Sequence, residues 1–308
     1  MSTPGDRSRW PVDPSTLEAV SALRIRVRRV VEGLPGGAHP SPHRGSSVEF
    51  AEHKKYSPGD DIRHVDWKAL ARTDRYFVKQ HQREVTLRCL MLLDCSASMG
   101  YRGSRAHEGK LASAVVLLAA MAHILVRQGD AAGFLTFSSG PGTFVPARHR
   151  PDHLASLMTR LAGIEASAAP GTSYAEVIRR AADAAGRRAM IVLASDLWSA
   201  GREVEVALGR LAARGHDVVV FHVLDPDEID LPFKEPSVFA GLEGEGEVEV
   251  DPAVIRGEYR RRVGEVRERW RRVCSEAGID LVPAPTDVPV ERVLHDFAAR
   301  RRRLVRPR

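Results

Sequence analysis

Three oxygen-bearing side chains stand at alternate positions directly after a short apolar run. Asp94, Ser96 and Ser98 follow the apolar residues 89–93, a stretch too short for a core helix and typical of a buried strand in a parallel sheet. Side chains at alternate positions of an extended segment point to the same side. One carboxylate and two hydroxyls suit a hard divalent cation such as Mg2+. Because so few charges leave such an ion short of ligands, we expect a second carboxylate from elsewhere in the chain.

The Asp-x-Ser-x-Ser pattern resembles the metal-ion-dependent adhesion site of the von Willebrand factor A domain. In that family a threonine from a later loop and an aspartate from a later strand complete the site. The resemblance implies Thr172, in Pro-Gly-Thr-Ser before an expected helix, and Asp196, at the end of the apolar run 191–195. It also implies Mg2+, or Mn2+ or Ca2+ in its place, and a partner protein whose acidic side chain completes the coordination.

A second pattern lies upstream, at residues 56–67, and reads Tyr-x-Pro-Gly-Asp-Asp-x-Arg-x-x-Asp-Trp, with Ala-Arg shortly after it. It resembles, almost position for position, a bacterial family known as domain of unknown function number fifty-eight. The resemblance runs from about residue 45 to at least residue 223. Members of that family look like companions of MoxR-type AAA+ ATPases, so the resemblance implies such an ATPase, or its client protein, as the partner. It implies an adaptor role in remodelling or maturation.

The polar segment itself allows two interpretations. In the first, its charged residues make directional contacts with a partner or support the metal site. In the second, the segment is an ion-paired cover over one edge of the sheet, anchored by two aromatic side chains, Tyr56 and Trp67. The residues concerned are Asp60, Asp61, Arg63, Asp66, Trp67 and Arg72.

The chain beyond these motifs alternates strand and helix patterns, which favours a parallel-rich sheet covered on both faces. We therefore predict an α/β fold: a von Willebrand factor A-like three-layer sandwich with a mostly parallel central sheet. Residues 86–225 form this domain, 1–85 an N-terminal helix, connector and motif segment, and 226–308 C-terminal strands and basic helices packed on the core. The small polar residues of 100–109 predict a mobile loop.

The expected elements follow from periodicity and turn residues. We expect strands at 46–51, 87–93, 131–137, 143–146, 189–195, 217–223, 237–240, 247–251 and 279–282, and helices at 15–32, 110–128, 152–161, 172–185, 202–214, 252–277 and 290–303.

Composition places the chain among ordinary globular proteins of the cytoplasm. Its 308 residues are 43% hydrophobic and 28% charged, with three widely spaced cysteines that form no obvious disulfide framework. The polar, proline-broken residues 1–14 do not look like a secretory signal. No apolar run reaches the ~20 residues that a membrane helix needs, so we expect no transmembrane segment.

The net charge of +6 raises the question of nucleic acid. Much of the excess lies in arginine clusters after residue 259, and Glu258, Glu265 and Glu268 are interleaved with the first of them, as on a solvated helix face. Aromatic residues for base stacking are not interleaved there. Nucleic-acid binding through the basic C-terminal region is therefore an alternative that the sequence does not favour.

The residues that often signal catalysis do not form a convincing site. Cys95 alternates away from the metal loop, the histidines are scattered, and the glycine-rich residues 241–246 are acidic, which would repel a phosphate. We therefore expect a binding protein and not an enzyme. A hydrolytic or phosphoryl-transfer enzyme using the same ion is the second alternative, and it would need a nucleophile and a base beside Asp94.

Overall fold

The computed structural model describes residues 14–32, 45–55, 76–85, 87–167, 171–242, 244 and 246–305. The chain divides into two compact units, one of residues 1–38 and 88–300 and a second of 39–87 and 301–308. Each unit is described by itself below.

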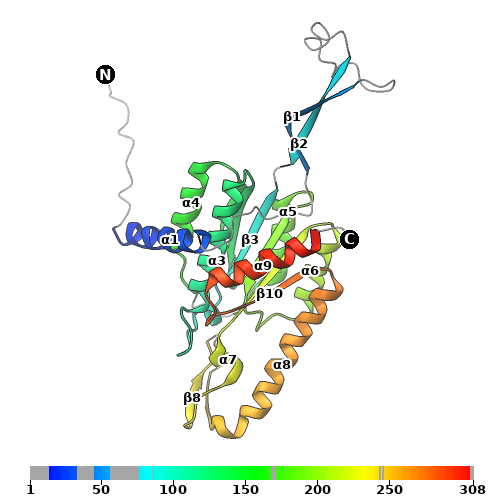
Figure 1. Ribbon diagram of the computed structural model, residues 1–308. Helices are drawn as coiled ribbons and strands as arrows, with labels where there is room; N and C mark the ends of the chain where they lie inside the picture. The colour runs from blue at the N-terminus through cyan, green and yellow to red at the C-terminus, as the bar shows by residue number, and fades with distance from the viewer. Residues whose placement is uncertain are drawn as a thin grey trace, which may run out of the picture. The chain divides into compact units, whose positions relative to one another are not determined.

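The larger unit is built on a six-stranded sheet (Figure 1). Its strands are β3 (Arg88–Asp94), β4 (Ala131–Phe137), β5 (Pro141–Arg148), β6 (Met190–Ser195), β7 (Asp217–Leu224) and β10 (Asp280–Pro285). They lie in the order β10-β7-β6-β3-β4-β5, and only β5 is antiparallel to its neighbour. The order runs outward from β3 in one direction and then, from β6, in the other, so the fold is doubly wound.

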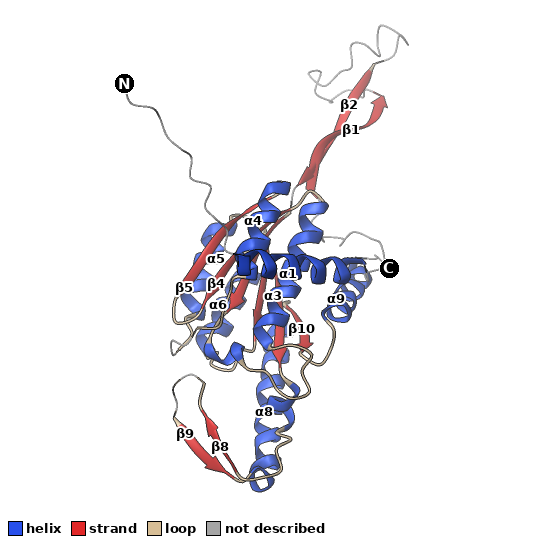
Figure 2. Ribbon diagram, turned by 90° about the vertical axis from the view of Figure 1, so that its left-hand side faces the viewer, coloured by secondary structure: helices blue, strands red, loops and turns tan. Residues whose placement is uncertain are grey.

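The central strands are buried on both faces, which explains their unbroken apolar sequences. Every residue of β4 and β6 is buried, and in β3 only Arg88 at the start is exposed. The two edge strands carry the prolines: β5 holds Pro141 and Pro146, and β10 holds Pro283 and Pro285. Proline is tolerated at an edge because one side of the strand needs no ladder donor. Helices cover both faces of the sheet (Figure 2).

One face of the sheet packs against α5 (Tyr174–Ala185), α6 (Arg202–Ala213) and the last part of α8 (Pro252–Glu276). Alternate residues of the strands, such as Leu90 and Leu92, point into this layer. Trp270 and Cys274 of α8 are fully buried in it. The arginine-rich helix is thus part of the core over its last turns.

The other layer contains α1 (Pro14–Glu32), α3 (Lys110–Arg127), α4 (Pro151–Ala162) and α9 (Val290–Val305). The first three pack on one another, and Phe297 of α9 packs edge to face on Phe221 of β7. Among the described residues α3 is the one helix long and apolar enough to cross a membrane, but 72% of it is buried within the fold. Its apolar character is what a core helix of a three-layer fold requires.

A segment inserted between β7 and α8 contains α7 (Pro226–Asp230) and a two-stranded antiparallel sheet of β8 (Ser237–Ala240) and β9 (Glu247–Val250). The sequence predicts both strands but not α7, because Pro226 reads as a breaker. Proline is well placed at the first turn of a helix. Asp225 and Glu228 form a reciprocal capping box around that turn, which starts the helix.

The loop before α3 differs from its prediction as a mobile segment. The backbone N–H of Gly103 donates to Asp225 Oδ2 over 2.8 Å, and the N–H and hydroxyl of Ser104 both donate to Asp227. Arg105 Nε adds an ion pair to Asp227 over 2.6 Å. A Cβ at Gly103 would come within 2.2 Å of Asp225 Oδ1, so glycine permits this close approach. The acidic start of α7 therefore fixes the loop.

The smaller unit contains β1 (Gly45–Lys55) and β2 (Phe77–Val85), which pair antiparallel from Gly45–Val85 to Lys55–Phe77. The sequence predicts a shorter β1 and misses β2, whose residues Phe77–Val85 carry six polar or charged side chains and only three apolar ones. The motif between the two strands, with Asp60, Asp61, Arg63, Asp66, Trp67 and Arg72, lies outside the described residues.

Candidate metal centre

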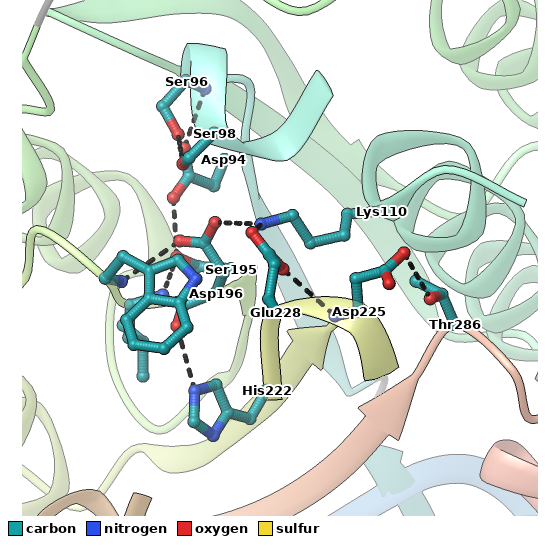
Figure 3. A network of polar contacts seen from close by, with 12 residues as sticks. Asp94, Ser96, Ser98, Lys110, Ser195, Asp196, His222, Asp225, Glu228 and Thr286 are labelled. Carbon is teal, nitrogen blue, oxygen red and sulfur yellow. Dashed lines mark hydrogen bonds and ion pairs between the residues drawn. The ribbon is translucent and has the colours of Figure 1, made fainter. Parts of the chain in front are cut away.

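The site lies where the winding of the sheet reverses, at the carboxyl ends of the neighbouring strands β3 and β6. The chain leaves β3 toward α3 in one layer, whereas α5, in the other layer, leads into β6. Loops on the two sides separate at such a point and leave a crevice in which α/β proteins bind ligands. Asp94 ends β3 and Asp196 follows β6, so the topology brings both predicted carboxylates to this crevice (Figure 3).

Asp94 is completely buried, and each of its carboxylate oxygens accepts hydrogen bonds. Oδ1 accepts from the backbone N–H of Ser96 over 2.9 Å. Oδ2 accepts from the hydroxyls of Tyr174 over 2.8 Å and of Ser195 over 2.6 Å. Burial, and after it the charge of Asp196, raises the pKa of Asp94 above its ordinary value. Two buried carboxylates with like charge are a pair that a cation between them would stabilise.

The two serines of the motif lie at the start of a short 3-10 helix, η2 (Ala97–Gly100). Their hydroxyl oxygens are 3.1 Å apart. Ser96 is 1% exposed, and this turn places both hydroxyls beside Asp94 (Figure 3). A 3-10 turn, in place of the extended segment that the sequence predicts, therefore brings the three oxygen-bearing side chains together.

Thr172 supplies a buried hydroxyl with no hydrogen-bond partner among the described residues. It lies two residues before Tyr174, whose hydroxyl binds Asp94, and the next residue, Ser173, donates its N–H to the carbonyl of Ser138 over 2.8 Å. These two bonds hold the start of α5 against the carboxyl ends of β3 and β4. Burying a hydroxyl without a hydrogen-bond partner costs about 1–3 kcal/mol of folding free energy. Such a hydroxyl is expected where a ligand, when bound, supplies the partner.

Asp196 is engaged by a buried lysine that the sequence analysis does not identify. Lys110, the first residue of α3, has no exposed surface, and its Nζ donates to Asp196 Oδ2 over 2.8 Å and to Glu228 Oε1 over 2.6 Å. Figure 3 shows the lysine side chain reaching between these two carboxylates. Burial alone would lower the pKa of Lys110, but the charges of Asp196 and Glu228 outweigh it and raise that pKa, so the ammonium stays charged.

The turn after β6 holds Asp196 firmly on its other side. Asp196 Oδ1 accepts from the N–H of Trp198 over 3.2 Å, and its carbonyl accepts from His222 Nε2 over 2.9 Å. Leu197 adopts a left-handed backbone conformation with φ of 56°, which is unusual for a branched residue. The strained turn orients Asp196 toward Lys110 and toward Asp94.

The residues present fit a divalent cation of the hard, oxygen-binding kind. The donor set consists of two carboxylates and three hydroxyls, one of which lacks a protein partner. No three His, Cys, Asp or Glu side chains of the described residues are grouped as a metal site, so a cation held here would depend on hydroxyl ligands. A donor set made of oxygen atoms alone, with two carboxylates, suits Mg2+ better than Zn2+.

Four further residues of the site carry no local signal in the sequence. Lys110 lies 86 residues from Asp196 and 118 from Glu228. Tyr174 and Ser195 lie 80 and 101 residues from Asp94. The nearest available signal is that Lys110 is a charged residue that opens an otherwise apolar helix with 13 buried residues.

Comparison with known protein families identifies this chain. Residues 52–269 match the model of the family described as Protein of unknown function DUF58. The chain belongs to this family. The motif at residues 56–67 lies inside the matched range, so the resemblance noted in the sequence is confirmed. The chain is also similar to uncharacterized proteins of Mycobacterium bovis and Mycobacterium tuberculosis, each 29% identical over 294 residues that cover 94% of this chain and 91% of the relative.

Two solved structures are similar to this DUF58 protein. The conserved hypothetical protein BatB from Bacteroides thetaiotaomicron is 18% identical, with a TM-score of 0.45 and coverage of 70% of this chain and 99% of BatB. The SpRpn10 VWA domain is 12% identical, with a TM-score of 0.40 and coverage of 68% and 94%. The doubly wound strand order of this chain, with one antiparallel edge strand and Asp94 at the reversal, is that of a three-layer α/β sandwich with a mostly parallel central sheet, as predicted.

Proposed function

We propose that this DUF58 protein is a metal-ion-dependent protein-interaction module that acts as an adaptor for a MoxR-type AAA+ ATPase. Its site takes Mg2+, or Mn2+ or Ca2+ in its place, through Asp94, Ser96, Ser98, Thr172 and Asp196. The partner, the ATPase or its client, contributes an acidic side chain to the ion. The choice of ATPase comes from the family resemblance, and the choice of metal-dependent binding comes from the site.

The observation that carries the proposal is the buried hydroxyl of Thr172, which has no hydrogen-bond partner among the described residues and lies two residues before Tyr174, whose own hydroxyl binds the buried Asp94. Each neighbouring polar atom of Asp94 and Asp196 has a protein partner, so the buried network is otherwise complete. A fold that buries one hydroxyl without a partner loses free energy unless a ligand binds there. A cation held by Asp94 would satisfy that hydroxyl.

With a divalent cation bound, the site would carry no net charge and would still offer an open coordination position to an acidic side chain. Asp94, Asp196 and Glu228 carry three negative charges, and Lys110 offsets one of them. A bound divalent cation supplies the two remaining positive charges and an open coordination position for an oxygen ligand. Lys110 and Glu228 hold Asp196 in place, and Tyr174 and Ser195 hold Asp94. The protein thus orients the first ligands before a partner arrives.

The enzyme and nucleic-acid alternatives gain no support from the site. A histidine of the site, His222, uses Nε2 to bind the carbonyl of Asp196, and burial lowers its pKa to about 4. That nitrogen is therefore engaged with the backbone and not with a serine hydroxyl. The arginines of α8 are interleaved with acids that they pair with, such as Glu258 with Arg261 and Glu268 with Arg271. Both pairs are solvated and typical of an exposed helix face.

The proposal is tested by affinity capture from native extract of the source organism, with the purified protein in Mg2+ or in EDTA. Wild type is compared with Asp94→Asn, after confirming that the variant is folded. Asp230→Asn is a matched control, because Asp230 is a half-exposed acid of α7 that pairs with Arg105 and does not touch the site.

We expect an AAA+ ATPase or its client to be retained by wild type and by Asp230→Asn far more in Mg2+ than in EDTA. Equal retention of the same proteins in Mg2+ and in EDTA, or by wild type and Asp94→Asn in Mg2+, would show that the site is structural. The adaptor mechanism would then be wrong.

A further inference from the structure

Exposed apolar side chains gather on the segment between β7 and α8. Nine large apolar side chains of the described residues are exposed, and five of them lie within residues 233–254. Val238, Val248 and Val254 are 60%, 59% and 79% exposed, and Phe233 and Leu242 complete the set. Single exposed apolar residues need no explanation, but a concentration of them marks an interaction surface.

The same segment is strongly acidic in a basic protein. Residues 226–251 contain nine aspartates and glutamates and one lysine, whereas the whole chain carries a net charge of +6. An acidic surface repels acidic partners and attracts basic ones. The segment is therefore complementary to a partner that is both apolar and basic.

Strand β9 separates these two properties onto its two faces. It reads Glu-Val-Glu-Val from Glu247 to Val250. The register pairs Glu249 with Val238 and Val248 with Phe239, so the glutamates share one face of the small sheet and Val248 shares the other with Phe239. Phe239 packs edge to face on Phe233, which extends the apolar face. A strand laid beside β9 would meet carboxylates on one face and apolar side chains on the other.

Both outer edges of this sheet lack a partner strand among the described residues, because β8 and β9 pair only with each other. Each strand has four residues. An isolated two-stranded hairpin is marginally stable in water, and an open edge is a template for an added strand. A third strand would stabilise the hairpin and cover part of its apolar face.

The segment is also connected to the metal centre. Glu228 of α7 binds Lys110, and its carbonyl accepts from the hydroxyl of Tyr259 in α8 over 2.6 Å. Arg256 of α8 donates to the carbonyls of Leu231 and Phe233, at 2.9 and 2.6 Å. The first turns of α8 thus fix the segment at the carboxyl-end side of the sheet, where the metal centre lies.

We propose that β9 is a docking edge for a partner protein, which adds an extended segment of alternating basic and apolar residues as a third strand. The basic residues lie beside Glu247 and Glu249, and the apolar residues lie beside Val248 and Val250. The inference rests on the proposed function for the identity of the partner, and it gives that partner a second contact that needs no metal.

The test uses fluorescence anisotropy of two labelled peptides of about twelve residues, one alternating valine and lysine and one alternating valine and glutamate. The full-length protein is kept in EDTA, so the metal centre does not contribute. We expect the lysine peptide to bind about tenfold or more tightly than the glutamate peptide, and added salt to weaken it. The same lysine peptide with alternate N-methyl groups loses its ladder donors and binds about tenfold more weakly.

Charge reversal by Glu247→Lys with Glu249→Lys is expected to reverse the preference between the two peptides. Val206→Ser is the matched control, since Val206 is 44% exposed on α6 and lies outside the segment; it leaves binding unchanged. Asp94→Asn also leaves peptide binding unchanged, which separates this inference from the metal-dependent function.

Equal affinity for the two peptides, no binding, or binding that survives the charge reversal would overturn the proposal. So would sedimentation velocity of the protein alone showing self-association that Glu247→Lys with Glu249→Lys abolishes, because the occupant of the edge would then be a second copy of this chain.

Discussion

A hydroxyl without a partner and an ammonium with two carboxylate partners lie in the same buried site. Thr172 contributes the first and Lys110 the second. In the metal-free protein the two side chains have opposite effects on stability. The hydroxyl costs stability in the absence of a ligand, whereas the ammonium is required there to offset the buried carboxylates. Substitutions at these residues separate metal binding from folding.

Thr172→Val removes the unpartnered hydroxyl and keeps the shape of the side chain. In EDTA we expect the free energy of unfolding to rise by about 1 kcal/mol, because a buried polar group without a partner is lost. In saturating Mg2+ we expect the stabilisation by the ion to be smaller than in wild type. Urea unfolding in both conditions measures the two effects. A loss of stability in EDTA would show that the hydroxyl has a structural partner.

Lys110→Met leaves Asp196 and Glu228 buried without their cation. We expect the free energy of unfolding in EDTA to fall by about 3–5 kcal/mol, the range for breaking a buried ion pair on one side. Mg2+ is expected to restore part of this loss, because a cation at the site supplies positive charge to Asp196. Thermal unfolding with and without Mg2+ measures the recovery.

The double variant Lys110→Met with Glu228→Gln is the control for that prediction. It removes one of the two unpaired carboxylates, so its loss of stability in EDTA is expected to be smaller than that of Lys110→Met alone. A double variant less stable than the single variant would show that Lys110 acts through its packing and not through its charge.

The sequence supplies the ligand types of the site but not the groups that hold them. Asp94, Ser96 and Ser98 are neighbours in the chain, so their spacing is readable. Thr172 and Asp196 follow from the order of a known pattern. Lys110 and Glu228 meet only because α3 begins beside the carboxyl end of β6 and because α7 is folded against it. No local pattern encodes a contact between residues so far apart.

At the scale of elements, α8 joins a solvated arginine-rich surface to the core. Trp270 is completely buried against the sheet layer of α5 and α6, and its indole N–H has no hydrogen-bond partner among the described residues. The contribution of this side chain is therefore apolar packing. Since α8 also fixes the docking segment through Arg256 and Tyr259, its anchoring affects that segment as well.

Trp270→Ala is expected to lower the free energy of unfolding by about 3–5 kcal/mol, because it leaves a large cavity under α8. Trp270→Phe keeps most of the apolar volume and removes only an unpartnered N–H, so we expect a loss of about 1–2 kcal/mol. Chemical denaturation of the two variants measures the difference. Equal losses would mean that the indole nitrogen makes a stabilising hydrogen bond.

Element boundaries show where sequence patterns mislead. The central strands are readable because burial on both faces makes them continuously apolar. Strand β10 extends through Pro283 and Pro285, which the sequence takes as its end, because an edge strand tolerates proline. Helix α7 begins at a proline because the first helical position needs no N–H donor, and the capping-box carboxylates accept from the N–H groups of Asp225 and Asp227. Both differences arise from the tertiary position of a residue whose local tendency is to break structure.

At the scale of the whole chain, the distribution of charge matters more than the net charge. The acidic residues gather in 226–251, whereas much of the basic excess lies in α8 and in the last residues of the chain. A single figure of +6 hides this separation. This separation of charge explains why composition points to nucleic acid, whereas the segment beside the candidate metal centre is complementary to a basic partner.

All three cysteines are buried in the larger unit, so their reactivity reports its global unfolding. Burial raises the pKa of Cys274 to about 12, so that thiol is protonated at neutral pH and unreactive in the folded state. We expect labelling by Ellman's reagent at pH 8 to be slow and to accelerate for all three thiols together in urea. Rapid labelling of one thiol in the folded protein would show that its layer opens locally.

Isothermal titration calorimetry of Mg2+ binding is the most direct test of the central claim that Asp94 and Thr172 belong to a metal centre. The account predicts one site in wild type and in Asp230→Asn, no measurable binding by Asp94→Asn, and affinity reduced by about tenfold in Thr172→Val. Mn2+ and Ca2+ titrated in the same way establish which ion is preferred. Absence of binding by wild type to all three ions, or unchanged binding by Asp94→Asn, would contradict the account.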